Sequence, residues 1–81
     1  MNNKQENYYC TTDLAIATTI SIFYPIDAID KKNPYKARFS FRQSKELEKI
    51  IKDYWAGKLK IEPKTFFNQL KIIKSRLYGE L

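Results

Sequence analysis

The sequence predicts a single α+β domain, in which a short strand, a helix and a β-hairpin precede two amphipathic helices. Two observations predict this class. Apolar and polar residues alternate along residues 35–42, as in a strand with one buried face. Apolar residues recur at spacings of three and four between residues 44 and 57 and between residues 63 and 79, as in helices. We expect these two helices to pack on one face of a small antiparallel sheet.

The first part of the chain predicts a tail, a strand and a helix. Residues 1–7 are polar and expected to be disordered, so the domain is expected to cover residues 8–81. Residues 8–11 have the aromatic and β-branched composition of a strand. Thr12 is the expected N-cap of a helix that Pro25 ends. The apolar face of this helix comprises Ile16, Ala17, Ile20, Phe23 and Tyr24, with Ala15 and Thr18 opposite.

A hairpin is predicted next. Residues 26–30 and 35–42 are its strands, and the turn-rich run Lys31-Lys32-Asn33-Pro34 joins them. Ala37, Phe39 and Phe41 are expected to point to the packed face of the second strand. Its solvated face comprises Lys36, Arg38, Ser40 and Arg42.

Cap residues delimit the last two helices. Ser44 is the expected N-cap of the first helix, and Gly57 stands where a C-terminal glycine belongs. The apolar face of that helix comprises Leu47, Ile50, Ile51, Tyr54 and Trp55. Pro63 suits the first turn of the last helix, and Gly79 its end. The buried stripe of the last helix comprises Phe66, Leu70, Ile73 and Leu77.

Short runs along the chain resemble one known family. These runs are Tyr9-Cys10-Thr11-Thr12-Asp13-Leu14, Arg38-Phe39-Ser40-Phe41, Glu46-Leu47-Glu48, Tyr54-Trp55-Ala56-Gly57, Ile61-Glu62-Pro63, Phe66-Phe67, Leu70-Lys71 and Leu77-Tyr78. Over residues 8–79 the chain resembles the short bacterial and mobile-element proteins grouped as domain of unknown function five-six-five-nine. The resemblance supports the α+β fold. It implies no activity and no catalytic residue.

Composition excludes several classes of enzyme. The chain has no His and one Cys, so it lacks Ser-His-Asp and Cys-His nucleophiles and a Cys/His zinc site of its own. Both glycines are predicted at helix ends, which leaves none for a phosphate-cradling loop. We expect no cofactor and no catalytic residue. A metal-dependent nuclease stays open as an alternative, with Asp13, Asp27 and Asp30 as the carboxylates that hold Mg²⁺.

The sequence predicts a cytoplasmic protein without a membrane segment. The apolar run over residues 14–26 is shorter than the ~20 residues that a transmembrane helix needs. Glu6 and Asp13 precede this run, which argues against a signal peptide. Cys10 cannot form a disulfide within the chain, and it is expected to be a small buried residue.

Positive charge gathers in the second part of the chain. Residues 1–30 carry a net charge of −3 and residues 31–81 carry +9, which together give +6 at pH 7. A basic surface on a small protein attracts polyanions such as DNA or RNA. We therefore expect a non-catalytic module that binds nucleic acid through phosphate contacts.

Two surfaces are the candidate binding sites. On the hairpin, Lys36, Arg38 and Arg42 share the solvated strand face. At 100° per residue, one strip of the last helix comprises Lys64, Phe67, Lys71, Lys74 and Tyr78. Lysines in such a strip follow phosphates while rings stack on bases. On the preceding helix, Lys49 and Lys52 each have an acidic neighbour four residues away. The outer side that carries them and Lys45 is interpreted as an ordinary solvated face.

Alternatives to this interpretation stay open. The hairpin charges can serve to protect a sheet edge from pairing, and Phe67 and Tyr78 can belong to the edge of the core. The protein can also be an adaptor or inhibitor of a mobile element that meets an acidic protein partner. Ile22 and Ile72 face away from the predicted core, and they mark a homodimer or partner contact if they share a surface. One continuous patch formed by the two basic surfaces would favour nucleic-acid binding, whereas scattered charges would favour a role in solubility.

Overall fold

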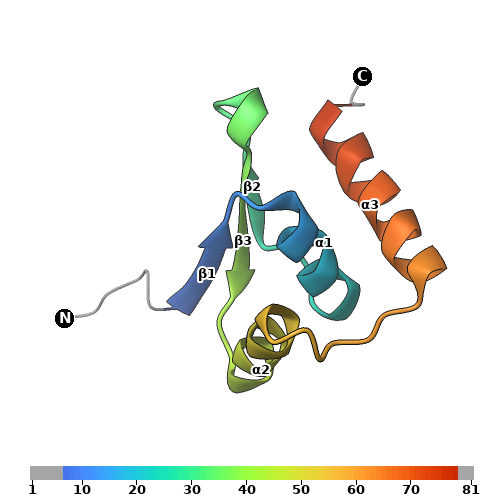
Figure 1. The fold of residues 1–81 in the computed structure, drawn as a ribbon. Coiled ribbons are helices and arrows are strands. Elements are labelled where there is room, and N and C mark those ends of the chain that lie inside the picture. Colours follow the sequence, from blue (N-terminus) through green and yellow to red (C-terminus); the bar gives the residue numbers. More distant parts are fainter. Residues whose placement is uncertain (1–6, 79–81) are drawn as a thin grey trace.

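A computed structural model describes residues 7–78, apart from the side chain of Pro34, and its fold is α+β as predicted (Figure 1). The elements in order are β1 (Tyr8–Thr11), α1 (Leu14–Phe23), β2 (Ala28–Asp30), the 3₁₀ turn η2 (Pro34–Lys36), β3 (Arg38–Arg42), α2 (Lys45–Trp55) and α3 (Pro63–Tyr78). Most of the predicted tail and the predicted helix end at Gly79 lie outside the described residues. No helix in the described part of the chain is long and apolar enough to cross a membrane.

The three strands form one antiparallel sheet with β3 in its centre, in the order β1-β3-β2. Directly opposed residues point to the same face of a sheet. The pairing of Tyr9 with Phe41, and of Thr11 and Ile29 with Phe39, therefore puts these side chains on one inner face. Backbone hydrogen bonding between the first and third strands begins one residue before the predicted strand, because the N–H of Gln43 donates to the carbonyl oxygen of Asn7 at 2.8 Å.

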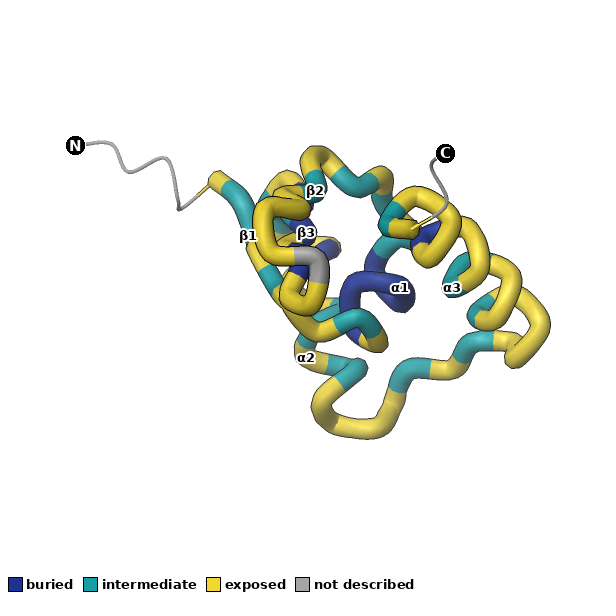
Figure 2. The backbone as a smooth tube through the Cα atoms, turned by 90° about the horizontal axis from the view of Figure 1, so that it is seen from above, coloured by how far each residue is buried: buried dark blue, intermediate teal, exposed yellow. Residues whose placement is uncertain are grey.

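Helix α1 lies between the sheet and α3, as two perpendicular views show (Figures 1 and 2). All residues from Ile16 to Ile20 are buried for this reason, and the expectation that only one face of the helix packs is wrong. Thr18 is fully buried, although the sequence places it opposite the apolar face. The core that results draws on every layer; its buried apolar members are Ile16, Ala17, Ile20, Ala37, Phe39, Phe41, Leu47 and Ile73.

The helix starts follow from side-chain capping. The carboxylate of Asp13 accepts the backbone N–H groups of Ala15 at 2.9 Å and of Ile16 at 3.3 Å, so Asp13 rather than Thr12 is the N-cap of α1. Ser44 caps α2 as predicted, because its Oγ accepts the N–H of Leu47 at 3.0 Å.

Helix α2 ends at a glycine, as predicted. Gly57 has a φ of +72°, a conformation that glycine adopts without strain. The N–H of Gly57 donates to the carbonyl of Tyr54 at 3.1 Å, and that of Lys58 donates to the carbonyl of Asp53 at 2.9 Å. These two bonds form a Schellman motif, which satisfies the last carbonyls of the helix.

The second hairpin strand is shorter than predicted. Asn33 Oδ1 accepts the N–H of Tyr35 at 3.0 Å, and the Asn33 carbonyl accepts the N–H of Lys36 at 2.9 Å. These bonds close the 3₁₀ turn that follows Asn33, so residues 35–37 lie outside β3. The prediction that Lys36 shares a strand face with Arg38 and Arg42 is therefore wrong.

Candidate nucleic-acid interface

The outer face of the sheet carries Arg38 and Arg42, which alternate with the buried Phe39 and Phe41 along β3. The guanidinium carbon of Arg42 lies 5.6 Å from the centroid of the Tyr8 ring, at cation–π distance. Asp30 is the cross-strand partner of Arg38. Because that carboxylate lies on the same face, this surface is only weakly basic.

Cys10 also lies on the outer face and is exposed, so the prediction that it is buried is wrong. Its Sγ atom is 3.5 Å from the Oγ atom of Ser40, the cross-strand partner of Cys10. The strand pairing explains this position, since Tyr9 and Thr11 occupy the inner face on either side of Cys10.

The second predicted surface lies on α3. We call its members the α3 strip: Lys64, Phe67, Lys71, Lys74 and Tyr78. All five are exposed, on the side of the helix turned away from the buried Ile73. Figure 2 shows this long exposed side, in yellow. Phe67 is 58% exposed and Tyr78 63%, so neither ring is part of the core.

The charge of the α3 strip is not offset by acidic residues within the helix, although Glu62 directly precedes it and accepts the N–H of Thr65 at 3.0 Å. Residues Pro63–Tyr78 include no acidic side chain. Among residues 7–78, Lys49 and Asp53 on α2 form an ion pair, with 3.4 Å between Nζ and Oδ2. This pair confirms that the face of α2 is mixed in charge, whereas the face of α3 is uniformly basic.

The two predicted surfaces lie on opposite sides of the molecule. Arg38 and Arg42 point away from the inner sheet face, and α1 separates that face from α3 (Figures 1 and 2). The sequence could not have indicated this separation, because it depends on the order of the layers.

The connection between β2 and β3, however, reaches the C-terminal end of α3. Lys31 Nζ donates to the carbonyl oxygen of Arg76 at 3.0 Å. Tyr35 and Tyr78 line the same small cavity, of about 110 Å³. The connection also carries Lys32 and Lys36, both exposed. The residues on either side of Lys36, Tyr35 and Ala37, line this cavity together with Tyr78, while Arg38 and Arg42 stay on the far side.

Tyr35 is the aromatic residue that the sequence prediction missed, because it was assigned to a strand. It is 94% exposed. The signal was present in Asn33-Pro34, a dipeptide that starts turns and places the next residue on the turn rather than in the ladder.

A third surface is an apolar groove between the end of α2 and the start of α3. It has a volume of about 380 Å³ and is lined by Thr19, Tyr54, Leu59, Ile61, Pro63 and Phe66. Two of these rings make edge-on contacts with exposed neighbours: Tyr54 with Trp55 at 5.0 Å, and Phe66 with Phe67 at 5.6 Å. Trp55 is 66% exposed, so α1 covers only part of the predicted apolar face of α2.

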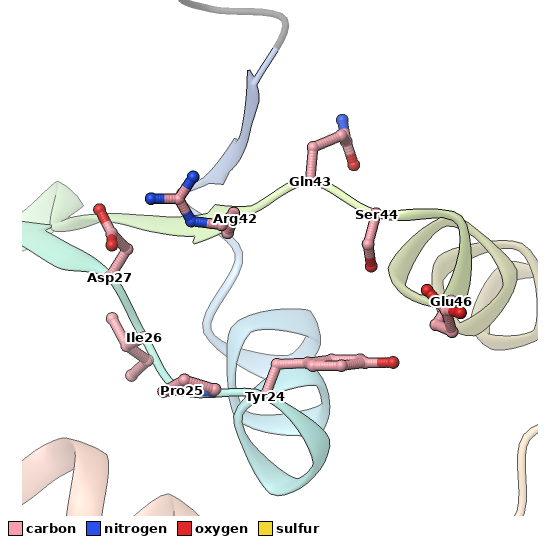
Figure 3. Close-up of a pocket in the computed structure, with 8 residues that line it drawn as sticks. All are labelled: Tyr24, Pro25, Ile26, Asp27, Arg42, Gln43, Ser44 and Glu46. Carbon is pink, nitrogen blue, oxygen red and sulfur yellow. The ribbon is translucent and has the colours of Figure 1, made fainter.

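A pocket of about 490 Å³ lies where α1 ends, β3 ends and α2 begins (Figure 3). The Arg42 and Asp27 side chains approach each other at one end, and the Tyr24 ring extends toward Glu46 at the other. Two carboxylates and one guanidinium line this pocket together with apolar walls. Its mixed charge does not favour a phosphate ligand.

Two of the three carboxylates considered for a metal site accept backbone hydrogen bonds. Asp13 caps α1, and Asp30 Oδ1 accepts the backbone N–H of Lys32 at 3.0 Å. Among residues 7–78, no three side chains of the Cys, His, Asp and Glu types gather in a way that could hold a metal ion.

Comparison with known protein families gives a match over most of the chain. The family model described as Domain of unknown function (DUF5659) covers residues 6–79. The chain belongs to this family. No curated protein and no solved structure matches it. The DUF5659 match spans every element from β1 to α3, so the α3 strip and the β2–β3 connection both lie within the family domain.

Proposed function

We propose that this DUF5659 protein is a non-catalytic module that binds nucleic acid through its phosphates, mainly along α3. The observation that carries the proposal is the α3 strip, in which three exposed lysines and two exposed rings share one side of a helix without acidic residues. Lysine and aromatic side chains interleaved in this way suit a phosphate backbone and its bases.

The dimensions of the strip support this function. A helix rises about 1.5 Å per residue, so Lys64 and Lys74 are separated by about 15 Å along α3. A DNA strand carries one phosphate per about 3.4 Å of helix axis. The strip can therefore lie along several consecutive phosphates.

The structure changes which predicted residues the proposal uses. Lys64, Lys71, Lys74 and Tyr78 form the main contact surface, and the β2–β3 connection with Lys36 extends it beyond the end of α3. Arg38 and Arg42 belong to a separate and less basic face, so we assign them a minor contribution. Because the two surfaces do not form one patch, the hairpin charges are better explained by solubility, and the proposal rests on α3. We place this function in the cytoplasm, in keeping with the single cysteine, and on a mobile element, in keeping with the sequence resemblance.

The test is the salt dependence of binding to a labelled oligonucleotide, measured by fluorescence anisotropy. Replacing Lys64, Lys71 and Lys74 together by Gln should weaken binding and reduce the slope of log K against log salt by about 2, if each lysine contacts one phosphate of a single strand. The matched control replaces Lys45, Lys49 and Lys52 of α2 by Gln, which removes the same charge from the mixed face.

Two results would exclude the proposal. One is the absence of binding to DNA and RNA even at low ionic strength. The other is an equal loss of affinity in the α3 and α2 variants, because this would reflect net charge rather than a site.

A second candidate function is docking of an acidic protein partner, and the groove between α2 and α3 favours it. Exposed Trp55 beside this groove is typical of an interface anchor. Lys58, Lys60 and Lys64, all exposed, lie on the segments that form the groove and would attract acidic residues around the anchor. In a pull-down after nuclease treatment, the wild-type protein should recover one stoichiometric partner protein, and the Trp55→Ala variant should not. Equal recovery of that partner by the wild type and by Trp55→Ala would contradict this function.

A further inference from the structure

Two tyrosines from distant parts of the chain meet at the C-terminal end of α3. Tyr35 lies on η2 and Tyr78 on the last turn of α3, and both line the cavity of about 110 Å³. The other residues that line it are Thr12, Leu14, Ala37, Phe39 and Leu77. The cavity is thus a small recess with both polar and apolar surface, and two largely exposed aromatic side chains border it.

Core packing does not account for these rings. Tyr35 is 94% exposed, so its ring buries almost no surface and contributes little to folding through the hydrophobic effect. Tyr78 is 63% exposed, and it follows Leu77, which is half-buried. Single exposed apolar residues are common, but two such rings lining one recess leave apolar surface that a ligand can cover.

Positive charge lies at the same end of α3. Lys31 Nζ is fixed by its bond of 3.0 Å to the carbonyl oxygen of Arg76, two residues before Tyr78. An ammonium group has three donors, and this bond uses one. Lys74 precedes Tyr78 by four residues and therefore lies beside it on the same side of α3. A recess bordered by two rings, with two cations at the same end of α3, suits a planar ring with polar edges that is attached to phosphates.

We propose that Tyr35 and Tyr78 hold one unpaired nucleobase, while Lys31 and Lys74 bind the flanking phosphates. This inference rests on the proposed function and deepens it, because it makes the ligand single-stranded DNA or RNA. In a duplex the bases are stacked and paired, and a base enters such a recess only after it has been unstacked at a cost in free energy. A single strand offers its bases freely.

The experiment compares three labelled oligonucleotides of one sequence: a DNA strand, an RNA strand and the DNA duplex. Wild-type protein should bind one or both single strands more tightly than the duplex. Tyr35→Ala should weaken single-strand binding by about 5- to 150-fold, the factor that loss of one stacked base gives. The slope against salt should stay unchanged, since no phosphate contact is removed.

Matched variants separate stacking from other effects. Tyr35→Phe keeps the ring and should keep the affinity. Tyr78→Ala should act like Tyr35→Ala, and its thermal unfolding shows whether α3 remains folded. Tyr35 is the decisive position, because its exposure means that its loss leaves the fold intact. A 2-aminopurine base in the strand should lose emission on binding to wild type and regain it with Tyr35→Ala.

The outcomes distinguish this inference from the function on which it rests. If the duplex binds as tightly as both single strands, or if Tyr35→Ala binds like wild type, the nucleobase site is wrong while the phosphate-binding function stands. If no oligonucleotide binds at low salt, both fail together. Tighter binding of DNA than RNA, or the reverse, supports the site and identifies the sugar of the natural ligand.

Discussion

Thr18 is buried because its helix, α1, lies between the sheet and α3. Its side chain is completely buried, and its Oγ1 atom has no hydrogen-bond partner among the described residues. The neighbouring Thr19 is nearly as buried, but its Oγ1 donates to the carbonyl of Ala15 at 2.9 Å. A buried hydroxyl without a partner costs about 1–3 kcal/mol, whereas a bonded one is close to neutral or stabilising.

Thr18→Val should therefore stabilise the protein. Valine keeps the shape of threonine and removes the unpaired hydroxyl, so we expect a gain of about 1 kcal/mol in the free energy of unfolding. Urea denaturation of wild type and variant measures this gain. Thr19→Val is the control and should give no gain, because it removes a bonded hydroxyl. A loss of stability in Thr18→Val would contradict the assignment of an unpaired group.

At the scale of single elements, local signals predicted some helix and strand ends and missed others. Ser44, Gly57 and Pro63 act as predicted, because caps and turns depend on neighbouring backbone groups. The start of β3 was missed, because the alternating pattern continues through residues 35–37 although the Asn33 bonds place them in or beside a 3₁₀ turn. The exposure of Trp55 was missed, because a helical period does not show how much of a face is covered.

The start of α1 offers a test at this scale. Asp13→Ala should cost about 0.5–2 kcal/mol of unfolding free energy, since two backbone N–H groups lose their acceptor. Thr12→Ala removes the cap expected from the sequence and should change stability by less than about 0.5 kcal/mol. Thermal or urea unfolding of the two variants decides between the caps. A larger loss in Thr12→Ala would show that the helix starts one residue earlier.

At the scale of the whole molecule, the fold class could be predicted but the arrangement of charge could not. Composition gives the +9 of residues 31–81, and helical periodicity gives the α3 strip. The layer order then puts Arg38 and Arg42 on the far side of the sheet from α3 (Figure 1). The same packing brings Lys31 and Tyr35 to the end of α3, a contact between segments far apart in the sequence.

The salt dependence of oligonucleotide binding, compared between two sets of variants, tests the central claim most directly. One set is the triple replacement of Lys64, Lys71 and Lys74 by Gln, and the other is Arg38→Gln with Arg42→Gln on the outer sheet face. We predict that the α3 variant reduces the slope of log K against log salt by about 2, and that the sheet variant reduces it by well under 1. A sheet variant that loses as much slope as the α3 variant, or more, would contradict a binding surface on α3.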